Sequence, residues 1–419
     1  MDYLEIEGGS PLCGEVCIQG SKNAALPILS AAVLNHGITV LKNCPKIIDV
    51  KNMLEILIGF GCKVNWEGDT LIIDATVMNS NQVAACYARQ MRSSIMLLGS
   101  LLGRTGTATL PYPGGCVIGE RPIDLHIEAL RKMGAELEEK GEGLCACCKK
   151  PQSSRVCLPF PSVGATENVI LLAVLAKGVT ILNNAAREPE IEELCRFLNC
   201  MGAKIQGAGT SQITITGVET LHDVEFTIVS DRIVAGTYML MTAAAGGRVI
   251  LNNPPLQQLG AVYGALRCMG VHCKECGEHL LLWRTERMKG LKGIRTEPYP
   301  GFPTDLQSPL MAALALAEGE SEIEETIFEA RFKIVEELLR MGADICTEGQ
   351  KAYIRGVRKL YGADLIAKEL RGGAALVLAA AAAEGKSRIL QYHYIERGYE
   401  NIIRDLQSLG VMVKKNIGK

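Results

Sequence analysis

Two interleaved series of similar segments run through the whole sequence, and they constrain its fold more than any other feature. In the first series a helix-like stretch ends at a glycine and a β-strand pattern follows, as in "KMGAEL" and "RMGADI". The central glycines of this series are residues 61, 134, 202, 270, 342 and 410. Self-similarity at a nearly fixed period indicates repeated structural modules. The sequence therefore predicts six modules that together fill the chain.

The second series consists of Ala- and Leu-rich segments that stop at a glycine and pass into a β-branched strand, as in "LLAVLAKGVTIL" (171–182). Glycine suits the left-handed C′ position at which many helices end. These segments are apolar on almost every side, so we expect buried helices. Each module then reads helix, strand, second helix and strands, which predicts an α/β fold with helices inside and sheets outside.

The length of the chain and its two ends predict the domain organisation. A chain of 419 residues is long enough for two hydrophobic cores. The sixth module ends shortly after Val413 without the paired strand that the other modules show, whereas residues 3–7, "YLEIE", have the alternation of a strand. We therefore expect the N-terminus to complete the last module, with domains at residues 22–229 and at residues 230–419 plus 1–21.

Composition excludes several classes of partner. The net charge of −2 provides no general basic field for nucleic acid or an anionic membrane surface. The longest apolar run, residues 374–383, is about half the length of a membrane-spanning helix, and the first residues lack the features of a secretory signal. The 16 cysteines are scattered, which favours free thiols in the cytoplasm. The one dense group, "CACC" (145–148), predicts thiols on a hairpin rather than a structural metal site.

Several apolar helices are expected to begin with a capping residue and a cation, as in "GSKNAA" (20–25) and "SDRIVAG" (230–236). The N–H groups and the dipole at a helix N-terminus attract anions. The cations at these starts are Lys22, Arg92, Arg232 and Arg371. This pattern predicts a phosphorylated ligand with several negative charges. The alternative that these residues only cap their helices stays open at each single position.

The segment "PGGCVIGERPIDLH" (113–126) places one cysteine in loop chemistry. Glycines permit unusual backbone angles and a close approach of a ligand. Arg121 would favour the thiolate of Cys116, and Glu120 would oppose it. We therefore interpret Cys116 as a reactive cysteine above an anion pocket, although Pro122 and Asp124 also suit the start of a helix.

The segments "GSKNAALPILSAAVL", "RSSIMLLGSLL", "PGGCVIGERPIDLHI", "FPSVGATEN", "NNAAREPEI", "GFPTDLQ" and "RGYENI" together resemble the UDP-N-acetylglucosamine 1-carboxyvinyltransferase family over residues 3–413. The resemblance implies an inside-out α/β barrel of two domains, each built from three βαβαββ units. It also implies transfer of the enolpyruvyl group of phosphoenolpyruvate to the 3′-hydroxyl of UDP-N-acetylglucosamine, the first committed step of peptidoglycan synthesis, through a tetrahedral intermediate. The family needs no metal or organic cofactor.

The resemblance also implies roles for particular residues. Lys22, Arg121 and Arg397 would grip the phosphate and carboxylate of phosphoenolpyruvate, and Asp305 would act as the base for the 3′-hydroxyl. Cys116 would be the thiol that the antibiotic fosfomycin alkylates. The nucleotide-sugar contacts would be Asn23, Arg92, Pro122, Asp124, Leu125, Ser162, Val163, Gly164 and Ile327, and Arg331 and Arg371 also occupy matching positions. Whether Cys116 or Lys22 protonates the substrate stays open.

Two departures keep alternatives open. Glu369 stands where the family usually has Asp, and Glu120 replaces a small residue beside Arg121. They leave room for a catalytically weak or silent paralogue that binds the nucleotide sugar and regulates wall synthesis through an unidentified partner. The sister enzyme that acts on shikimate 3-phosphate shares the fold, but its chains lack the "PGGC" loop. The six histidines show no H-x-x-x-H pair, so a zinc hydrolase is not supported.

Overall fold

The computed structural model describes residues 2–114, 118–119, 122–141 and 143–416. The chain divides into two units, and the first comprises Met1–Gln19, Val117–Glu120 and Ser230–Lys419. The second comprises Gly20–Cys116 and Arg121–Val229. Each unit contains its own hydrophobic core.

Unit 2 contains three modules in chain order, and helices labelled η are 3-10 helices. The first module comprises α1 (Lys22–Ala32), β3 (Ile38–Lys42), α2 (Ile48–Gly59), β4 (Lys63–Glu67) and β5 (Thr70–Asp74). The second comprises α3 (Ala85–Ala88), η1 (Arg92–Met96), α4 (Leu97–Thr105), β6 (Thr107–Pro111), α5 (Asp124–Lys132), β7 (Glu136–Lys140), β8 (Gly143–Cys147) and β9 (Arg155–Cys157). The third comprises α6 (Val163–Ala173), β10 (Val179–Asn183), α7 (Pro189–Cys200), β11 (Lys204–Gln206), β12 (Gln212–Thr216) and β13 (Val224–Thr227). The sheets have the strand orders β13-β3-β5-β4, β6-β8-β7 and β11-β12-β10-β9.

Unit 1 repeats this arrangement. It begins with β1 (Tyr3–Gly8) and β2 (Leu12–Cys17) and continues with α8 (Arg232–Ala245), β14 (Gly247–Asn252), η2 (Leu256–Gln258), α9 (Gly260–Met269), β15 (His272–Cys276), β16 (His279–Arg284) and β17 (Ile294–Arg295). The next module comprises η3 (Thr304–Leu306), α10 (Gln307–Leu314), β18 (Glu320–Glu324), η4 (Arg331–Ile334), α11 (Val335–Arg340), β19 (Asp344–Glu348), β20 (Lys351–Arg355) and β21 (Asp364–Ile366). The last comprises α12 (Leu370–Ala382), β22 (Gly385–Leu390), η5 (Tyr392–Arg397), α13 (Ile402–Ser408) and β23 (Met412–Asn416). The sheets have the orders β15-β16-β14-β2, β17-β18-β20-β19 and β21-β22-β1-β23.

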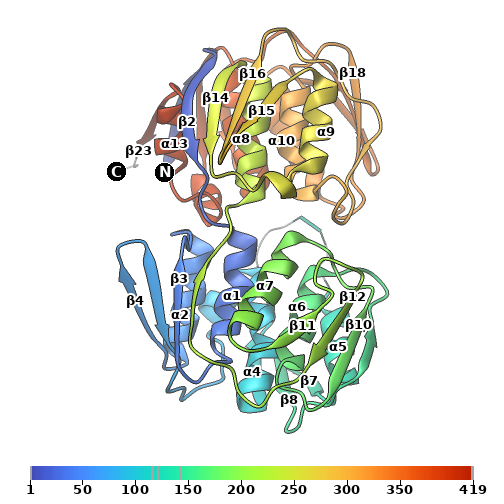
Figure 1. Cartoon of the computed structure of the whole chain (residues 1–419). Coiled ribbons are helices and arrows are strands. Elements are labelled where there is room, and N and C mark those ends of the chain that lie inside the picture. The colour runs from blue at the N-terminus through green and yellow to red at the C-terminus, as the bar shows by residue number, and fades with distance from the viewer. Residues whose placement is uncertain (1, 115–117, 120–121, 142, 417–419) are drawn as a thin grey trace. The chain divides into compact units, whose positions relative to one another are not determined.

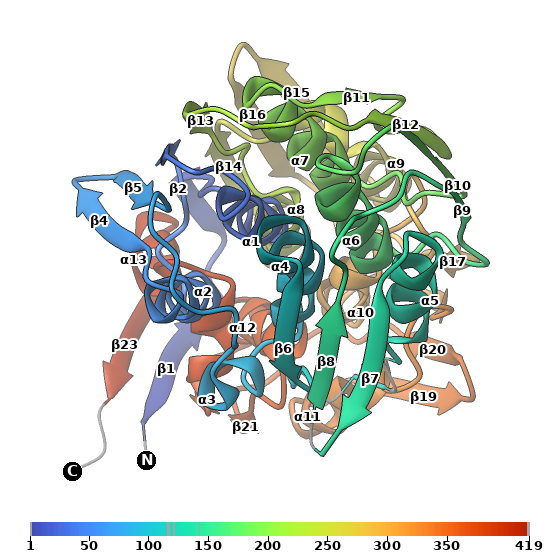
Figure 2. The same cartoon turned by 90° about the horizontal axis from the view of Figure 1, so that it is seen from below.

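The Ala- and Leu-rich helices lie inside each unit. Every residue of α10 is buried, as are residues 370–381 of α12. Figure 1 shows α8 and α10 between sheets of unit 1, and Figure 2 shows the sheets of unit 2 outside α1, α4 and α6. Helices without a polar face are stable only when other elements cover every side. The prediction of an inside-out, two-domain α/β fold is confirmed.

The N-terminal strand completes the last sheet. β1 pairs antiparallel with β23, with Ile6 opposite Val413, and also pairs antiparallel with β22. Leu4 and Ile6 are fully buried, so β1 contributes core side chains as well as backbone hydrogen bonds. The prediction that residues 3–7 supply this strand is confirmed.

The two glycine series behave differently. All six glycines of the first series have positive φ, from 81° at Gly270 to 100° at Gly61, so they allow the left-handed exit from a helix. In the second series the predicted C′ position is correct for Gly106 and Gly246 but wrong for others. Helix α1 already ends at Ala32, and a Cβ atom on Gly37 would lie 1.9 Å from an Asp223 oxygen. At that position glycine provides room for a neighbouring side chain rather than a helix end.

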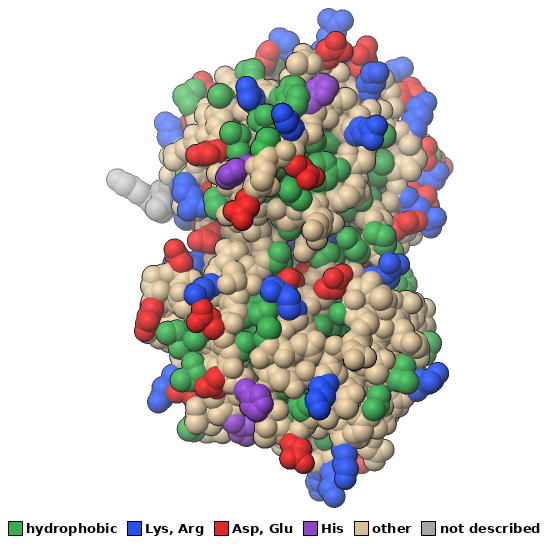
Figure 3. Space-filling model, in the orientation of Figure 1, with side chains coloured by type: hydrophobic (Ala, Val, Ile, Leu, Met, Phe, Trp, Pro, Cys, Tyr) green, Lys and Arg blue, Asp and Glu red, His purple; other side chains and the backbone are tan. Residues whose placement is uncertain are grey.

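The surface matches the balanced composition. On the face shown in Figure 3, acidic and basic side chains are interspersed over both units. Within the described ranges, every helix is too short or too polar to cross a bilayer. The cysteines that the structure describes are free thiols, and Cys145 and Cys147 lie on β8 of the β7–β8 hairpin.

Candidate active site

Asp305 lies between two buried arginines of unit 1. Its Oδ1 atom is 2.7 Å from Nη2 of Arg331, and its Oδ2 atom is 2.8 Å from Nη2 of Arg371. The side chains of Arg331 and Arg371 are 2% and 5% exposed, whereas that of Asp305 is 26% exposed. The carboxylate is therefore the part of this group that solvent or a ligand can reach.

The charges around Asp305 determine its protonation. Burial by itself raises the pKa of this carboxyl group, but Arg371 and Arg331 outweigh burial, and Arg232 adds to their effect. The pKa of Asp305 consequently lies well below its usual range. In this state Asp305 is an ionised carboxylate that holds protons weakly.

Arg371 has hydrogen-bond donors that no described residue uses. Its Nη1 atom is buried and has no hydrogen-bond partner among the described residues, which is unusual for a guanidinium group. Burial lowers the pKa of Arg371, but the nearby Asp305 carboxylate dominates and raises it. Burial also raises the pKa of the neighbouring Tyr399 to about 12, so its hydroxyl is neutral at physiological pH. The permanent cation, with two unused N–H bonds on Nη1, is suited to an anionic ligand.

Glu369 caps the helix that carries Arg371. Its Oε2 atom accepts a hydrogen bond from the Arg371 N–H at 2.7 Å, and its Oε1 atom accepts one from the Gly372 N–H. The same Oε2 atom lies 3.7 Å from Nη1 of Arg331. The longer side chain at this position therefore still serves as an N-cap and places a second carboxylate beside Arg331.

A buried acid links Asp305 to the loop before η4. Glu325 accepts hydrogen bonds from the N–H groups of Ile327 and Phe328 at 2.9 and 3.1 Å and from the Thr304 hydroxyl at 2.9 Å. Thr304 Oγ1 in turn accepts a bond from Nε of Arg331 at 3.3 Å. Sequence reasoning missed Glu325 and Thr304, because only the folded chain brings them beside the predicted site residues.

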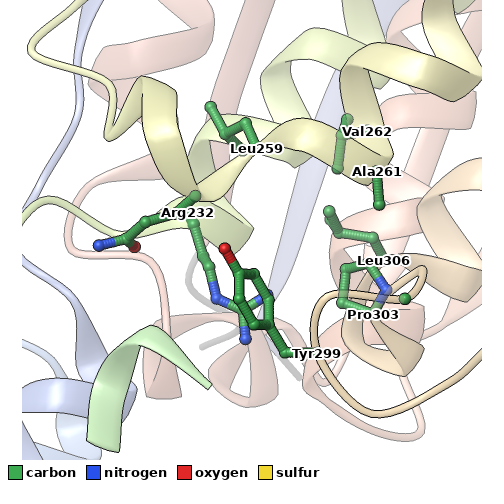
Figure 4. A pocket seen from close by; sticks show the side chains of 9 residues that line it. Arg232, Leu259, Ala261, Val262, Tyr299, Pro303 and Leu306 are labelled. Carbon is green, nitrogen blue, oxygen red and sulfur yellow. The ribbon is translucent and has the colours of Figure 1, made fainter. Parts of the chain in front are cut away.

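A small pocket adjoins this cluster within unit 1. Its lining residues include Arg232, Leu259, Tyr299, Pro303 and Leu306, which Figure 4 labels. The Arg232 guanidinium lies 5.7 Å from the centre of the Tyr299 ring. The remaining predicted residue of unit 1, Arg397, ends η5, which packs on α12.

In unit 2, Lys22 forms a nearly buried ion pair. Its Nζ atom is 2.7 Å from Oδ2 of Asp49, and the two side chains are 11% and 3% exposed. Lys22 is the first residue of α1, directly after the N-cap Ser21. A cation there opposes the helix dipole, so Asp49 or a bound anion must compensate. Asp49 belongs to α2, and sequence reasoning missed it.

The other predicted residues of unit 2 lie at helix starts. Arg92 begins η1, and its Nη2 atom donates to the Pro122 carbonyl at 3.1 Å. Asp124 and Leu125 begin α5, and Ser162 caps α6 ahead of Val163 and Gly164. Asn23 follows Lys22 in α1. The structure therefore groups the predicted nucleotide-sugar residues of this unit on the N-terminal ends of α1, η1, α5 and α6.

Three predicted features lie outside the described residues. These are Cys116, Arg121 and Glu120. Among residues that the structure does describe, no group of His, Cys, Asp and Glu side chains is arranged to hold a metal ion.

Known structures share this fold. The enolpyruvyl transferase NikO from Streptomyces tendae superimposes with a TM-score of 0.90 at 23% identity, covering 100% of this chain and 99% of that chain. EPSP synthase from Acinetobacter baumannii gives a TM-score of 0.76 at 17% identity, with 100% of both chains covered. At these identities the likeness shows the fold alone, which is that of the enolpyruvyl transferases.

Sequence comparison defines the family more closely. The family model of EPSP synthase (3-phosphoshikimate 1-carboxyvinyltransferase) matches residues 6–406. UDP-N-acetylglucosamine 1-carboxyvinyltransferase 2 of Caldanaerobacter subterraneus subsp. tengcongensis is 46% identical, with 98% of each chain covered. UDP-N-acetylglucosamine 1-carboxyvinyltransferase of Nitratidesulfovibrio vulgaris is 44% identical, with 99% of each chain covered. The chain belongs to the EPSP synthase family and, within it, to the UDP-N-acetylglucosamine 1-carboxyvinyltransferases.

Proposed function

We propose that this protein transfers the enolpyruvyl group of phosphoenolpyruvate to the 3′-hydroxyl of UDP-N-acetylglucosamine and releases phosphate, the first committed step of peptidoglycan synthesis. The main support for this proposal is the position of Asp305 between Arg331 and Arg371. Nη1 of Arg371 also has no hydrogen-bond partner among the described residues. Lys22 and Arg371 also stand in the first turns of inner helices, where the dipole favours anions over cations. In each unit taken by itself, such a cationic helix start suits an anionic group of a ligand.

In the proposed reaction, Lys22, Arg121 and Arg397 bind the phosphate and carboxylate of phosphoenolpyruvate. A bound anion competes with Asp305 for the arginines, which raises the pKa of that carboxyl group towards the range of a useful base. The 3′-hydroxyl then attacks C2 and gives its proton to Asp305, while C3 receives a proton from Cys116 or Lys22. The tetrahedral intermediate loses a proton from C3 and expels phosphate, which restores the enol ether.

The nucleotide sugar has its own proposed contacts. We assign its binding to Asn23, Arg92, Pro122, Asp124, Leu125, Ser162, Val163, Gly164 and Ile327, with Arg331 and Arg371 supporting Asp305 and the substrate anions. The N-terminal first turns of α5 and α6 support this assignment, because the N–H groups and the dipole of a helix start suit a diphosphate. No metal ion or organic cofactor has a role in this scheme.

We also propose a cytoplasmic location. The free thiols of the described cysteines support it, because cysteines persist in that form in a reducing compartment. A regulatory protein partner is not part of this proposal.

The test is phosphate release from phosphoenolpyruvate, measured with and without UDP-N-acetylglucosamine. We expect release only when the nucleotide sugar is present, and we expect fosfomycin to abolish it by adding one molecule to Cys116, located by peptide mass spectrometry. Binding of the nucleotide sugar without any phosphate release would instead support the silent paralogue.

A further inference from the structure

The side-chain amide of Asn168 bridges two backbone groups at the junction of η1 and α4. Asn168 lies on α6 and is fully buried. Its Oδ1 atom accepts a hydrogen bond from the Gly99 N–H at 2.7 Å, and its Nδ2 atom donates one to the Ile95 carbonyl at 3.1 Å. A carbonyl and an N–H four residues apart are the pair that an uninterrupted α-helix joins directly. Asn168 therefore supplies a peptide-like amide where the 3-10 helix becomes an α-helix.

The same amide fixes the protonation of His126. The second N–H of Nδ2 faces Nδ1 of His126 at 2.8 Å. The amide cannot be flipped, because the Gly99 N–H only donates and the Ile95 carbonyl only accepts. His126 Nδ1 must therefore accept, and the neutral ring carries its proton on Nε2.

These contacts join three elements with predicted nucleotide-sugar residues. Arg92 begins η1, and His126 lies two residues after Asp124 at the start of α5. Asn168 itself lies on α6, which begins after Ser162.

The residues around this junction are tightly packed. A Cβ atom on Gly164 would lie 2.8 Å from Cε1 of His126, and one on Gly99 would lie 2.9 Å from Oδ1 of Asn168. Contacts this short oblige a neighbour to move whenever one group moves. A change in the Asn168 amide is therefore transmitted to the starts of α5 and α6.

We propose that Asn168 is a positioning residue for the nucleotide-sugar site, because its amide holds η1, α5 and α6 together and keeps His126 in the Nε2–H tautomer. This inference rests on the proposed function, since the three elements matter for catalysis only if they bind UDP-N-acetylglucosamine. It adds a residue that touches neither substrate but determines the relative placement of those that do.

The first experiment measures binding of UDP-N-acetylglucosamine by calorimetry to the full chain and to Asn168→Asp and Asn168→Leu. Aspartate keeps the acceptor for Gly99 but lacks both donors, and leucine lacks all three bonds. We expect the dissociation constant to rise about tenfold in each variant, while kcat at saturating substrates changes less than threefold. The matched control is Ser100→Ala, which removes a buried hydroxyl that bonds to Ser30 on α1 and to the Leu97 carbonyl on α4 and breaks none of the three hydrogen bonds of the Asn168 amide.

The second experiment reads the tautomer directly by nitrogen-15 NMR of the wild-type histidines, which needs no variant. We expect an unprotonated Nδ1 and a protonated Nε2 at His126. His126→Asn offers an acceptor near the position of Nδ1 and should bind within threefold of the wild type, whereas His126→Leu should weaken binding about tenfold.

Results that differ from these expectations separate a failure of the Asn168 inference from a failure of the proposed function. The inference is overturned if His126 carries its proton on Nδ1, if the Asn168 variants bind within threefold of the wild type, or if Ser100→Ala weakens binding as much as they do. If the wild type itself fails to bind UDP-N-acetylglucosamine, the proposed function fails instead, and the tautomer still reports whether the amide network exists.

Discussion

At the scale of single residues, the candidate site depends on a carboxylate that is shared by two guanidinium groups. Arg331 and Arg371 make Asp305 a weak base as it stands, so its proposed role requires a substrate anion that draws the arginines away. In the proposed reaction, substrate binding and activation of the base would thereby be coupled. An enzyme of this kind would avoid activating its base before phosphoenolpyruvate is present.

Replacement of Asp305 by asparagine tests this coupling. We expect Asp305→Asn to lower kcat by on the order of 10²–10⁴-fold, because the 3′-hydroxyl loses its base, with little change in nucleotide-sugar binding. Steady-state phosphate release and calorimetry give the two values. An unchanged kcat would assign the base to another residue.

The same variant has a pH signature in stability. The pKa of Asp305 in the folded protein lies below its unfolded value of about 3.9, so its contribution is complete above that pH and is lost as pH falls further. We expect Asp305→Asn to cost about 2 kcal/mol, below the value for fully buried pairs because a quarter of the side chain is exposed. Urea unfolding should give the same difference at pH 7 and pH 5 and a smaller one at pH 3.5. A difference that grows on acidification would contradict this.

Replacements of Glu369 test whether its longer side chain disturbs the site or serves only as the helix cap. Glu369→Asp keeps an oxygen acceptor for the Arg371 and Gly372 N–H groups, so we expect turnover close to that of the wild type. Glu369→Ala removes the cap. It should lower the free energy of unfolding by about 1–2 kcal/mol and should also lower turnover. If Glu369→Asp instead turned over much faster than the wild type, the extra methylene of Glu369 would lower the activity, and the wild-type chain would be a weakened enzyme.

At the scale of elements, three inner helices, α1, α8 and α12, combine a capping side chain with a cation in the first turn. Ser21 precedes Lys22, Asp231 precedes Arg232, and Glu369 precedes Arg371 by two residues. The cap satisfies backbone N–H groups, whereas the cation opposes the dipole. The pairing therefore serves stability and ligand binding through different residues of the same turn.

The cap of α8 shows how these two contributions separate. Asp231 accepts from the N–H groups of Ile233 and Val234 at 2.8 and 3.0 Å. Asp231→Ala should lower the free energy of unfolding by about 1–2 kcal/mol, and Asp231→Asn by only a few tenths, because asparagine caps nearly as well. Equal losses in urea unfolding would show that the charge of Asp231, rather than its cap, stabilises the helix.

At the scale of the whole molecule, the chain closes unit 1 with its first strand. β1 lies between β22 and β23, so residues from opposite ends of the sequence share one sheet. Such non-local pairing carries a high entropic cost before its contacts form. We expect this sheet to be the part of unit 1 that depends most on a few core side chains.

Ile6→Ala tests that dependence. Ile6 is fully buried, so the variant should cost about 2–5 kcal/mol and increase hydrogen exchange in β22 and β23, while strands of unit 2 keep wild-type protection. The control Glu7→Ala removes only the exposed ion pair with Lys386 and should change stability by less than about 1 kcal/mol. Equal loss of protection in both units would mean that their cores unfold together.

Much of the fold and part of the site follow from local pattern. The six glycine exits, the buried Ala- and Leu-rich helices and the strand at residues 3–7 are all visible as periodicity or punctuation over short stretches. The starts of α1, α6, α8 and α12 are visible as capping residues. Several helix ends are not visible in the sequence. A glycine that leaves space for a neighbouring side chain looks the same in sequence as a glycine that allows the turn at a helix end.

The sequence by itself determined the number of modules, the buried helices and the helix starts that carry cations, because each depends on neighbours within a few residues. Only the tertiary structure decided which charges meet. Asp305 joins arginines 26 and 66 positions away, and Asn168 reaches His126 across 42 positions. These contacts depend on how helices pack, and packing brings together side chains whose separation along the chain carries no local signal.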